Sequence, residues 1–381
     1  MRRLVGRAAA RGGRYICRAA GVRVPTLDFA ELQSGAPSSA RARELSALER
    51  AMTVEPGFFA LRVPEAVLAR ASVERAYAES RRFFVELPRD AKARYHASRD
   101  ARGRGWTSSG EEPSYEPGVR SMVEAYDVGR ELPPGGTNGD PAMGPNVWPS
   151  AELPSFEPTV LALYAALSHI SHELFGAIAE ALRLHPDALR AHAGENARAT
   201  MRLLRYPPAA SGHGEPAGTP PSPPPSPPVG TPWPTRAERA DGDGGADGAA
   251  GISTHTDFEC FTLMHQSAPG LELRPLVGGA PARGLWVRPP ATGASELLVI
   301  GGDMLERFTN GTVRATEHRV PQTPWERYAL IRFNGLVSGA RIAPLPEFGA
   351  ARYGAVTQGE HMARVYEALG SGKGAQGTAS W

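Results

Sequence analysis

A histidine and an aspartate, His255 and Asp257, stand two residues apart in a strand-like run at residues 252–263. Successive side chains of a strand point to opposite faces, so residues two apart share one face. The imidazole and the carboxylate can therefore bind the same cation. Taken alone, the pair is equally consistent with two polar side chains on the solvent-facing side of an edge strand.

A third ligand must come from elsewhere in the chain, and His318 is the obvious candidate. Two histidines and one carboxylate on one side of a metal form the facial arrangement of non-haem Fe(II) oxygenases, which leaves the opposite positions open for substrate and O₂. The alternative for His318 is a histidine packed inside a barrel with its hydrogen bonds satisfied. We predict that His255, Asp257 and His318 are the metal ligands and the catalytic residues.

Four motifs follow one another in the second half of the chain. They are His255-Thr256-Asp257, the stretch from Gly302-Asp303 to Asn310-Gly311, His318-Arg319-Val320, and Arg327-Tyr328-Ala329. Their order and spacing resemble the isopenicillin N synthase-like family of Fe(II)/2-oxoglutarate oxygenases. The resemblance covers most of residues 24–370. It implies an Fe(II) cofactor, 2-oxoglutarate and O₂ as co-substrates, and oxidation of a small molecule, usually its hydroxylation, with release of succinate and CO₂.

The resemblance also assigns two residues to 2-oxoglutarate. A buried guanidinium needs a partner, and a bidentate contact with a carboxylate supplies one. In similar enzymes the arginine at the position of Arg327 holds the distal carboxylate of 2-oxoglutarate. Tyr206 ends an Arg-x-x-x-Tyr-Pro segment at residues 202–207, in which the family's tyrosine hydroxyl hydrogen-bonds 2-oxoglutarate. The alternative for Tyr206 is a tyrosine packed at the end of a strand.

Ala329 departs from the family pattern, which places a serine two residues after the arginine. Losing one hydrogen bond to a charged group costs about 1.5–3 kcal/mol. This departure keeps a second enzyme class open. That class is an oxidase of the same fold that uses no 2-oxoglutarate and takes all electrons from its substrate, as isopenicillin N synthase does.

Two non-oxygenase classes are less consistent with the sequence. A jelly-roll binding protein without turnover would have no reason to keep all three ligands. Nucleic-acid modification is disfavoured because the net charge is only +2 and the basic residues are dispersed. The absence of an apolar run of about 18 residues predicts no membrane span. The two cysteines, far apart in the chain, fit a reducing compartment.

The elements that must position these residues are a succession of short strands separated by Pro/Gly turns. The expected strands after the metal motif are 251–257, 259–265, 271–275, 284–288, 296–301, 312–320 and 326–334. Strands at this spacing indicate a double-stranded β-helix, or jelly roll. Helices are expected from Glu65 to Leu87, from Pro154 to Leu184 and over 358–369, because their apolar residues recur at helical spacing. The fold class is therefore mainly β with flanking helices (α+β).

The domain organisation follows from these elements. We expect a basic extension at 1–23, an N-terminal oxygenase region with strands and helices at 24–196, a jelly-roll domain at 197–345, and a C-terminal helix and tail at 346–381. A Pro/Gly-rich insertion at about 209–250 interrupts the jelly roll, and its composition predicts disorder. Such a segment can recruit a partner domain. We interpret it as a neutral insertion.

The first 23 residues contain seven arginines and no acidic residue. This composition is typical of an organellar transit peptide, although serine is absent; the alternative is a disordered basic extension. The sequence therefore predicts a cytoplasmic protein, or an organellar one if the extension is a transit peptide.

Overall fold

The computed structural model describes residues 15–16, 22–33, 39–100, 102–137, 139–140, 143–194, 197–209 and 248–370. Most of the basic extension, nearly all of the Pro/Gly-rich insertion and the tail after residue 370 lie outside the described residues, as do the predictions made for them. Within the described part of the chain, no helix combines the length and the apolar character that crossing a membrane requires.

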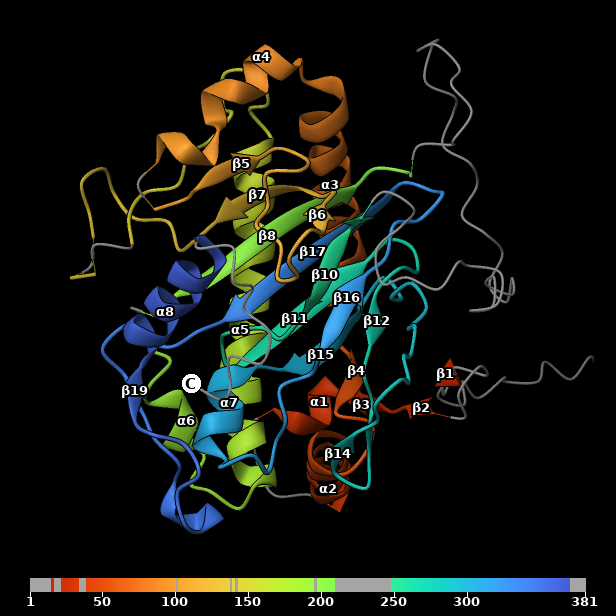
Figure 1. Cartoon of the computed structure of the whole chain (residues 1–381), viewed down its shortest axis with the longest axis vertical. Coiled ribbons are helices and arrows are strands. Elements are labelled where there is room, and N and C mark those ends of the chain that lie inside the picture. The colour runs from red at the N-terminus through yellow and green to blue at the C-terminus, as the bar shows by residue number, and fades with distance from the viewer. Residues whose placement is uncertain are drawn as a thin grey trace, which may run out of the picture.

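A twisted sheet of eight strands forms the centre of the molecule, in the order β3, β4, β15, β11, β17, β8, β7, β5 (Figure 1). The strands are β3 (Thr26–Asp28), β4 (Phe58–Arg62), β15 (Glu296–Gly301), β11 (Phe261–Gln266), β17 (Arg327–Asn334), β8 (Ala199–Tyr206), β7 (Glu124–Val128) and β5 (Gly105–Thr107). Neighbours are antiparallel except β3 and β4. Strands from both halves of the chain thus share one sheet.

A second, three-stranded sheet faces the large one. It consists of β10 (Ile252–His255), β16 (His318–Val320) and β12 (Glu272–Leu273), with β16 in the middle. One apolar cluster joins the two sheets, with Met264, Leu298 and Ala329 from the large sheet and Ile252 and Val320 from the small one. The two sheets therefore enclose a common interior, and the predicted jelly-roll core is confirmed.

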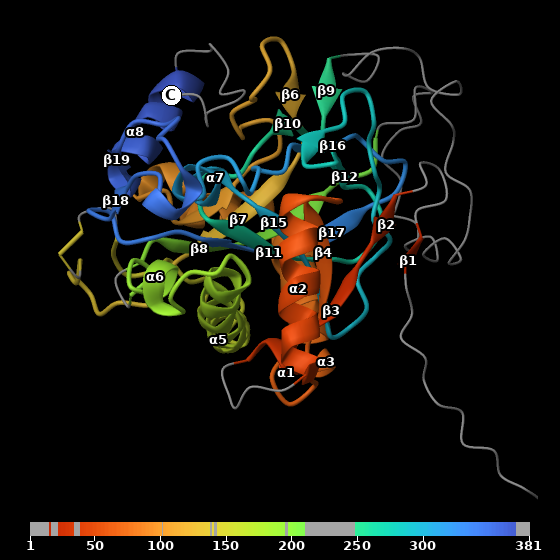
Figure 2. The same ribbon diagram turned by 90° about the horizontal axis from the view of Figure 1, so that it is seen from below.

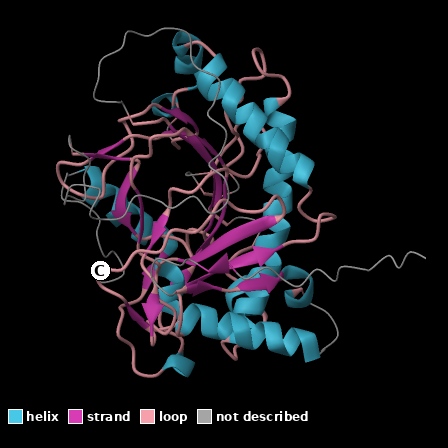
Figure 3. Ribbon diagram, turned by 90° about the vertical axis from the view of Figure 1, so that its right-hand side faces the viewer, coloured by secondary structure: helices cyan, strands magenta, loops and turns pink. Residues whose placement is uncertain are grey.

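Most of the helices cover the outer face of the large sheet (Figures 2 and 3). The helices are α1 (Phe29–Leu32), α2 (Ser39–Thr53), α3 (Arg70–Arg81), α4 (Arg89–Lys92), α5 (Phe156–Ala181), α6 (Asp187–Arg190), α7 (Asp303–Phe308) and α8 (Gln358–Gly370). α5 packs its apolar side on the sheet, where the rings of Phe175 and Phe261 lie 4.7 Å apart. A second apolar cluster fills this helix–sheet layer. α8 instead contributes Met362 and Val365 to the interior cluster.

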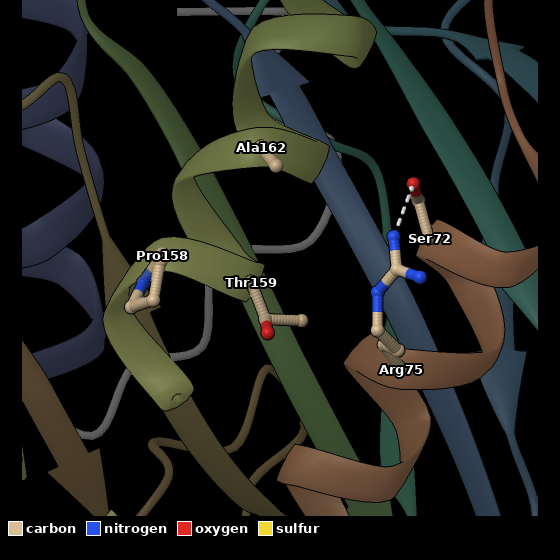
Figure 4. Close-up of a pocket in the computed structure, with 5 residues that line it drawn as sticks. All are labelled: Ser72, Arg75, Pro158, Thr159 and Ala162. Atoms are coloured by element: carbon tan, nitrogen blue, oxygen red, sulfur yellow. Dashed lines mark hydrogen bonds between the residues drawn. The ribbon is translucent and has the colours of Figure 1, made fainter. Parts of the chain in front are cut away.

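The remaining elements are short. They are β1 (Tyr15–Ile16), β2 (Arg23–Val24), β6 (Arg120–Ser121), β9 (Ala249–Ala250), β13 (Leu276–Val277), β14 (Ala280–Pro281), β18 (Arg341–Ile342) and β19 (Val356–Thr357), with a π-helical turn at Arg82–Glu86 and 3₁₀ turns at Ala93–Tyr95, Ala97–Arg99 and Pro346–Phe348. A surface pocket of about 230 Å³ lies between α3 and α5, lined by Ser72, Arg75, Pro158, Thr159 and Ala162 (Figure 4).

Some expected elements are shorter than the sequence predicts. The strand expected at 312–320 is reduced to β16, and the one expected at 284–288 is reduced to a single bridge between Val287 and Leu273. The Gly302-Asp303 motif begins α7, with Gly302 directly before its first residue. A Cβ at Gly302 would lie 2.3 Å from the Glu259 carbonyl oxygen, so the glycine is required by this close approach.

The centre of the large sheet should be sensitive to cavity formation. Leu263 is fully buried on β11, between Val299 of β15 and Arg332 of β17. We expect Leu263→Ala to lower the free energy of unfolding by about 2–5 kcal/mol, measured by urea denaturation. Val277→Ala, at a position that is 56% exposed, is the matched control and should change it by no more than about 0.5 kcal/mol. Equal effects of the two substitutions would contradict this assignment of the core.

Candidate active site

His255, Asp257 and His318 meet in the interior between the two sheets. His255 ends β10 and lies directly opposite His318, which begins β16. Asp257 lies two residues beyond β10, which ends earlier than expected. Its Oδ1 is 3.6 Å from His318 Nε2 and 3.9 Å from His255 Nε2, and the three potential ligand atoms lie within 4.8 Å of one another. This spacing suits a single cation.

Main-chain carbonyls fix the orientation of both imidazoles. Nδ1 of His255 lies 2.8 Å from the Ser253 carbonyl oxygen, and Nδ1 of His318 lies 2.9 Å from that of Thr316. Because a carbonyl oxygen can only accept, each Nδ1 carries the proton and donates it. Each Nε2 then presents a lone pair toward Asp257, as a metal ligand must.

The charge state of the site also suits a metal. Burial, together with the neighbouring His318, lowers the pKa of His255 well below its ordinary value, so this imidazole is neutral at physiological pH. Burial raises the pKa of Asp257, and a bound cation would reverse that effect by favouring the carboxylate. Thr262 Oγ1 donates to the second oxygen of Asp257. Two imidazole nitrogens and one oriented carboxylate oxygen fit Fe(II).

Arg327 and Tyr206 lie side by side in the same interior. They are directly opposed on β17 and β8, and the Arg327 guanidinium carbon lies 4.4 Å from the centre of the Tyr206 ring. Arg327 is 1% exposed, and among the described residues its Nε and Nη1 have no hydrogen-bond partner. Burial raises the pKa of Tyr206 to about 12, so its hydroxyl stays protonated. The pair presents N–H and O–H groups that suit a carboxylate.

Gln266 was not identified from the sequence, yet it orients Arg327. Its Oε1 accepts a hydrogen bond of 3.0 Å from Arg327 Nη2. Its Nε2 donates to the carbonyl oxygens of Pro290, at 2.6 Å, and Pro289, at 3.3 Å, which holds the amide in one orientation. Gln266 lies opposite Ala329 on the neighbouring strand. In the sequence, Gln266 could be recognised only as a polar residue four positions after Thr262, which places both on one face of the strand.

Arg202 and Tyr115 were also missed. Arg202 lies on the inner face of β8 and forms a bidentate pair with Asp127, at 2.7 and 2.8 Å, and a bond of 2.7 Å with Glu112. The Tyr115 ring is stacked on the His255 ring, with 4.2 Å between centroids and an interplanar angle of 4°. Alternation from Tyr206 could have indicated Arg202, whereas no sequence pattern pointed to Tyr115.

Two aromatic residues of the N-terminal region, Trp106 and Tyr126, lie away from this interior. Trp106 and Tyr126 belong to the apolar cluster between the sheet and the helices. The Trp106 indole N–H donates to Glu124, and the Tyr126 hydroxyl donates to the Val147 carbonyl oxygen at 2.6 Å. Packing is therefore their role.

Two family models match the chain. Residues 24–151 match the model described as the non-haem dioxygenase in morphine synthesis N-terminal domain, and residues 234–335 match that of the 2OG-Fe(II) oxygenase superfamily. The chain also resembles solved structures of this fold. A putative 2OG-Fe(II) oxygenase family protein from Caulobacter crescentus has a TM-score of 0.66 and 24% identity over 90% of this chain and 98% of its own. A full-length Neurospora crassa protein, solved in complex with alpha-KG and thymine, has a TM-score of 0.69 and 20% identity over 93% and 98%.

Curated relatives cover most of the chain. A 2-oxoglutarate-Fe(II) type oxidoreductase of Metarhizium rileyi, ppzD, is 30% identical over 346 residues, which are 86% of this chain and 84% of that protein. A 2-oxoglutarate-dependent dioxygenase of Aspergillus niger, caaD, is 27% identical over 82% of this chain and 84% of its own length. Together with the matches to the two family models, this similarity shows that the chain belongs to the 2OG-Fe(II) oxygenase superfamily.

Proposed function

We propose that this chain is an Fe(II)- and 2-oxoglutarate-dependent dioxygenase that hydroxylates a small molecule, with His255, Asp257 and His318 as the iron ligands and Arg327 and Tyr206 as the 2-oxoglutarate contacts. Iron(II) bound there supplies the redox chemistry by which O₂ oxidises 2-oxoglutarate, to succinate and CO₂, together with the substrate. The observation that carries the proposal is the buried Arg327. It lies in the same interior as the three ligands and has two N–H groups without a partner among the described residues.

The side chains have separable tasks in this reaction. The carbonyls of Ser253 and Thr316 keep the two Nε2 lone pairs directed at one point, and Thr262 holds the Asp257 carboxylate. Arg327, oriented by Gln266, supplies a fixed pair of N–H donors for the carboxylate of the 2-oxo acid that lies farther from iron. The surrounding apolar cluster excludes water, which keeps the oxidation directed at the bound substrate.

The alternative of an oxidase that uses no 2-oxoglutarate is not favoured. The names of both relatives described above include 2-oxoglutarate. The Arg327 N–H groups that lack a partner in the described part of the chain would also stay unsatisfied in a site that binds no second carboxylate.

The test is an anaerobic titration. The apoprotein is reconstituted with Fe(II), and 2-oxoglutarate is added while the weak visible charge-transfer band of an iron-chelated 2-oxo acid is recorded. The proposal requires the band to appear and O₂ uptake to depend on 2-oxoglutarate. Iron binding without the band, or O₂ uptake that needs no 2-oxoglutarate, would direct attention to the oxidase.

Restoring the family serine should strengthen 2-oxoglutarate binding. Ala329 shares the face of Arg327 on β17, so a hydroxyl at 329 adds one hydrogen bond to the same carboxylate. We expect Ala329→Ser to lower the Kd for 2-oxoglutarate by about tenfold in the charge-transfer titration. Ala125→Ser is the control, because Ala125 lies in the same cross-strand row beyond Leu204, away from Arg327. An unchanged or weaker affinity in Ala329→Ser would be inconsistent with a carboxylate at this position.

A further inference from the structure

Arg104 is a buried cation that the proposed reaction does not use. It directly precedes β5 and is 9% exposed. Its Nη1 donates to Thr200 Oγ1 at 3.3 Å. Among the described residues its buried Nε has no hydrogen-bond partner, and no carboxylate lies within ion-pair distance of the guanidinium. Burying a guanidinium without a counter-charge costs several kcal/mol in general, so such a group indicates that an anionic ligand completes the site.

Gly129 shows on which face of the sheet the guanidinium lies. A Cβ built on Gly129 would lie 2.2 Å from Arg104 Nη2 and 2.5 Å from its Cζ. Gly129 directly follows β7 and is two positions from Asp127, so it shares the face of Asp127, whose carboxylate pairs with Arg202 on the inner face. The guanidinium therefore occupies the inner face of the sheet, in the space that any larger residue at 129 would fill.

The strand register relates Arg104 to the metal ligands. Thr262, which donates to Asp257, lies opposite Phe333, and Phe333 lies opposite Thr200, the residue that Arg104 contacts. These residues form one row across β11, β17 and β8. Two strand spacings separate Thr262 from Thr200, a distance of about 10 Å. Phe333 packs against the interior apolar cluster and supplies an apolar surface between the two polar ends of the row.

The neighbouring carboxylates do not neutralise Arg104. Asp127 gives both of its oxygens to Arg202, and Glu112 is bonded to the same guanidinium. This local group of one cation and two anions is held together by its own short hydrogen bonds. Arg104 contacts Thr200, which precedes Arg202 by two residues on the inner face of β8. Its Nε, buried without a partner among the described residues, belongs to the Nε–Nη2 edge that suits a bidentate carboxylate.

We propose that Arg104 determines substrate specificity by binding a carboxylate of the substrate, whose apolar body lies over Phe333 with its reacting carbon toward the metal ligands. This proposal rests on the proposed function, because it assigns the substrate of that same site. The substrate class is a monocarboxylic acid with an apolar or aromatic portion long enough to span the row from Thr262 to Thr200.

The test uses phenylalkanoates from phenylacetate to 5-phenylpentanoate, each paired with its neutral amide. Their binding to the anaerobic protein with Fe(II) and 2-oxoglutarate is followed by the change that they cause in the charge-transfer band. We expect at least one acid to bind about 10- to 100-fold more tightly than its amide. Arg104→Gln should remove this preference. Gly129→Ala should also remove it, since the methyl group displaces the guanidinium without changing the charge. Arg120→Gln, at an exposed arginine, should keep it.

The ratio of acid to amide affinity separates recognition from a structural role, because a loosened loop would weaken both compounds alike. If the acids bind no better than their amides, if none binds, or if Arg104→Gln keeps the preference, the assignment of Arg104 is wrong while the charge-transfer band still supports the proposed function. If the band itself does not form with 2-oxoglutarate in the unmodified protein, both proposals fail.

Discussion

The His318→Ala variant is expected to lose 2-oxoglutarate-dependent O₂ uptake and to bind Fe(II) about 100-fold more weakly or worse. His318 Nε2 is one of three donors that lie within 4.8 Å of one another, and it lies opposite the second histidine across the β10–β16 pair. Disturbing a residue that merely orients a metal ligand already costs about 10- to 100-fold in affinity or activity, so removing a ligand should cost more. Anaerobic Fe(II) titration and an oxygen electrode measure the two effects.

A surface histidine provides the matched control for this variant. The His185 side chain is 77% exposed, and His185→Ala should leave iron affinity and O₂ uptake unchanged. Thermal unfolding of both variants in the presence of a chelator shows whether the jelly roll is intact without metal. A folded His318→Ala protein that still forms succinate from 2-oxoglutarate at the unmodified rate would remove His318 from the ligand set.

Replacing Arg327 by glutamine should weaken 2-oxoglutarate binding by about 2–5 kcal/mol, or about 30- to 4,000-fold in Kd. The guanidinium is 1% exposed and stacked on Tyr206, and its remaining N–H groups have no partner among the described residues. Its loss removes the charge and both donors at once. Arg327→Lys keeps the charge but not the paired donors. Its Kd for 2-oxoglutarate in the charge-transfer titration should therefore lie between those of the unmodified protein and Arg327→Gln.

The Fe(II) affinity of Arg327→Gln shows whether the substitution acts on 2-oxoglutarate binding alone. Arg327→Gln should bind Fe(II) as the unmodified protein does, because the proposed function makes Arg327 a contact of 2-oxoglutarate and not a metal ligand. Arg341→Gln, at an exposed position on β18, is the control and should leave both affinities unchanged. An unchanged Kd for 2-oxoglutarate in Arg327→Gln would mean that the distal carboxylate binds elsewhere.

The grouping of the candidate site residues could be predicted from the sequence because the four motifs that contain most of them occur in the order and spacing of a known family. His255 and His318 are 63 positions apart, and only antiparallel pairing places them opposite each other. The resemblance assigned both residues to one metal site without stating which strands pair. Gln266 and Tyr115 could not be found in this way, since their roles depend on which segments pack together and neither belongs to one of the four motifs.

The fold was predictable to the same extent. Strand β15 was expected at 296–301, where it lies, and α5 is shorter than the expected helix by a few residues at each end. α2 was not expected, because five of its fifteen residues are charged and its large apolar residues are only Leu45, Leu48 and Met52. It is held by tertiary contacts instead, including the Arg41–Glu180 ion pair of 2.6 Å with α5. Such contacts are not visible in local periodicity.

The two carbonyl acceptors that orient His255 and His318 bear on how such a protein can evolve. Every amino acid carries a main-chain carbonyl, so a substitution at Ser253 or Thr316 leaves the acceptor in place. The orientation of the imidazoles therefore does not depend on which side chains stand at positions 253 and 316, whereas the contacts of Arg104 and Phe333 are made by their side chains and change with any substitution there. Substitutions of side chains around the substrate can therefore change substrate specificity during evolution while the two imidazoles keep the orientation that iron binding requires.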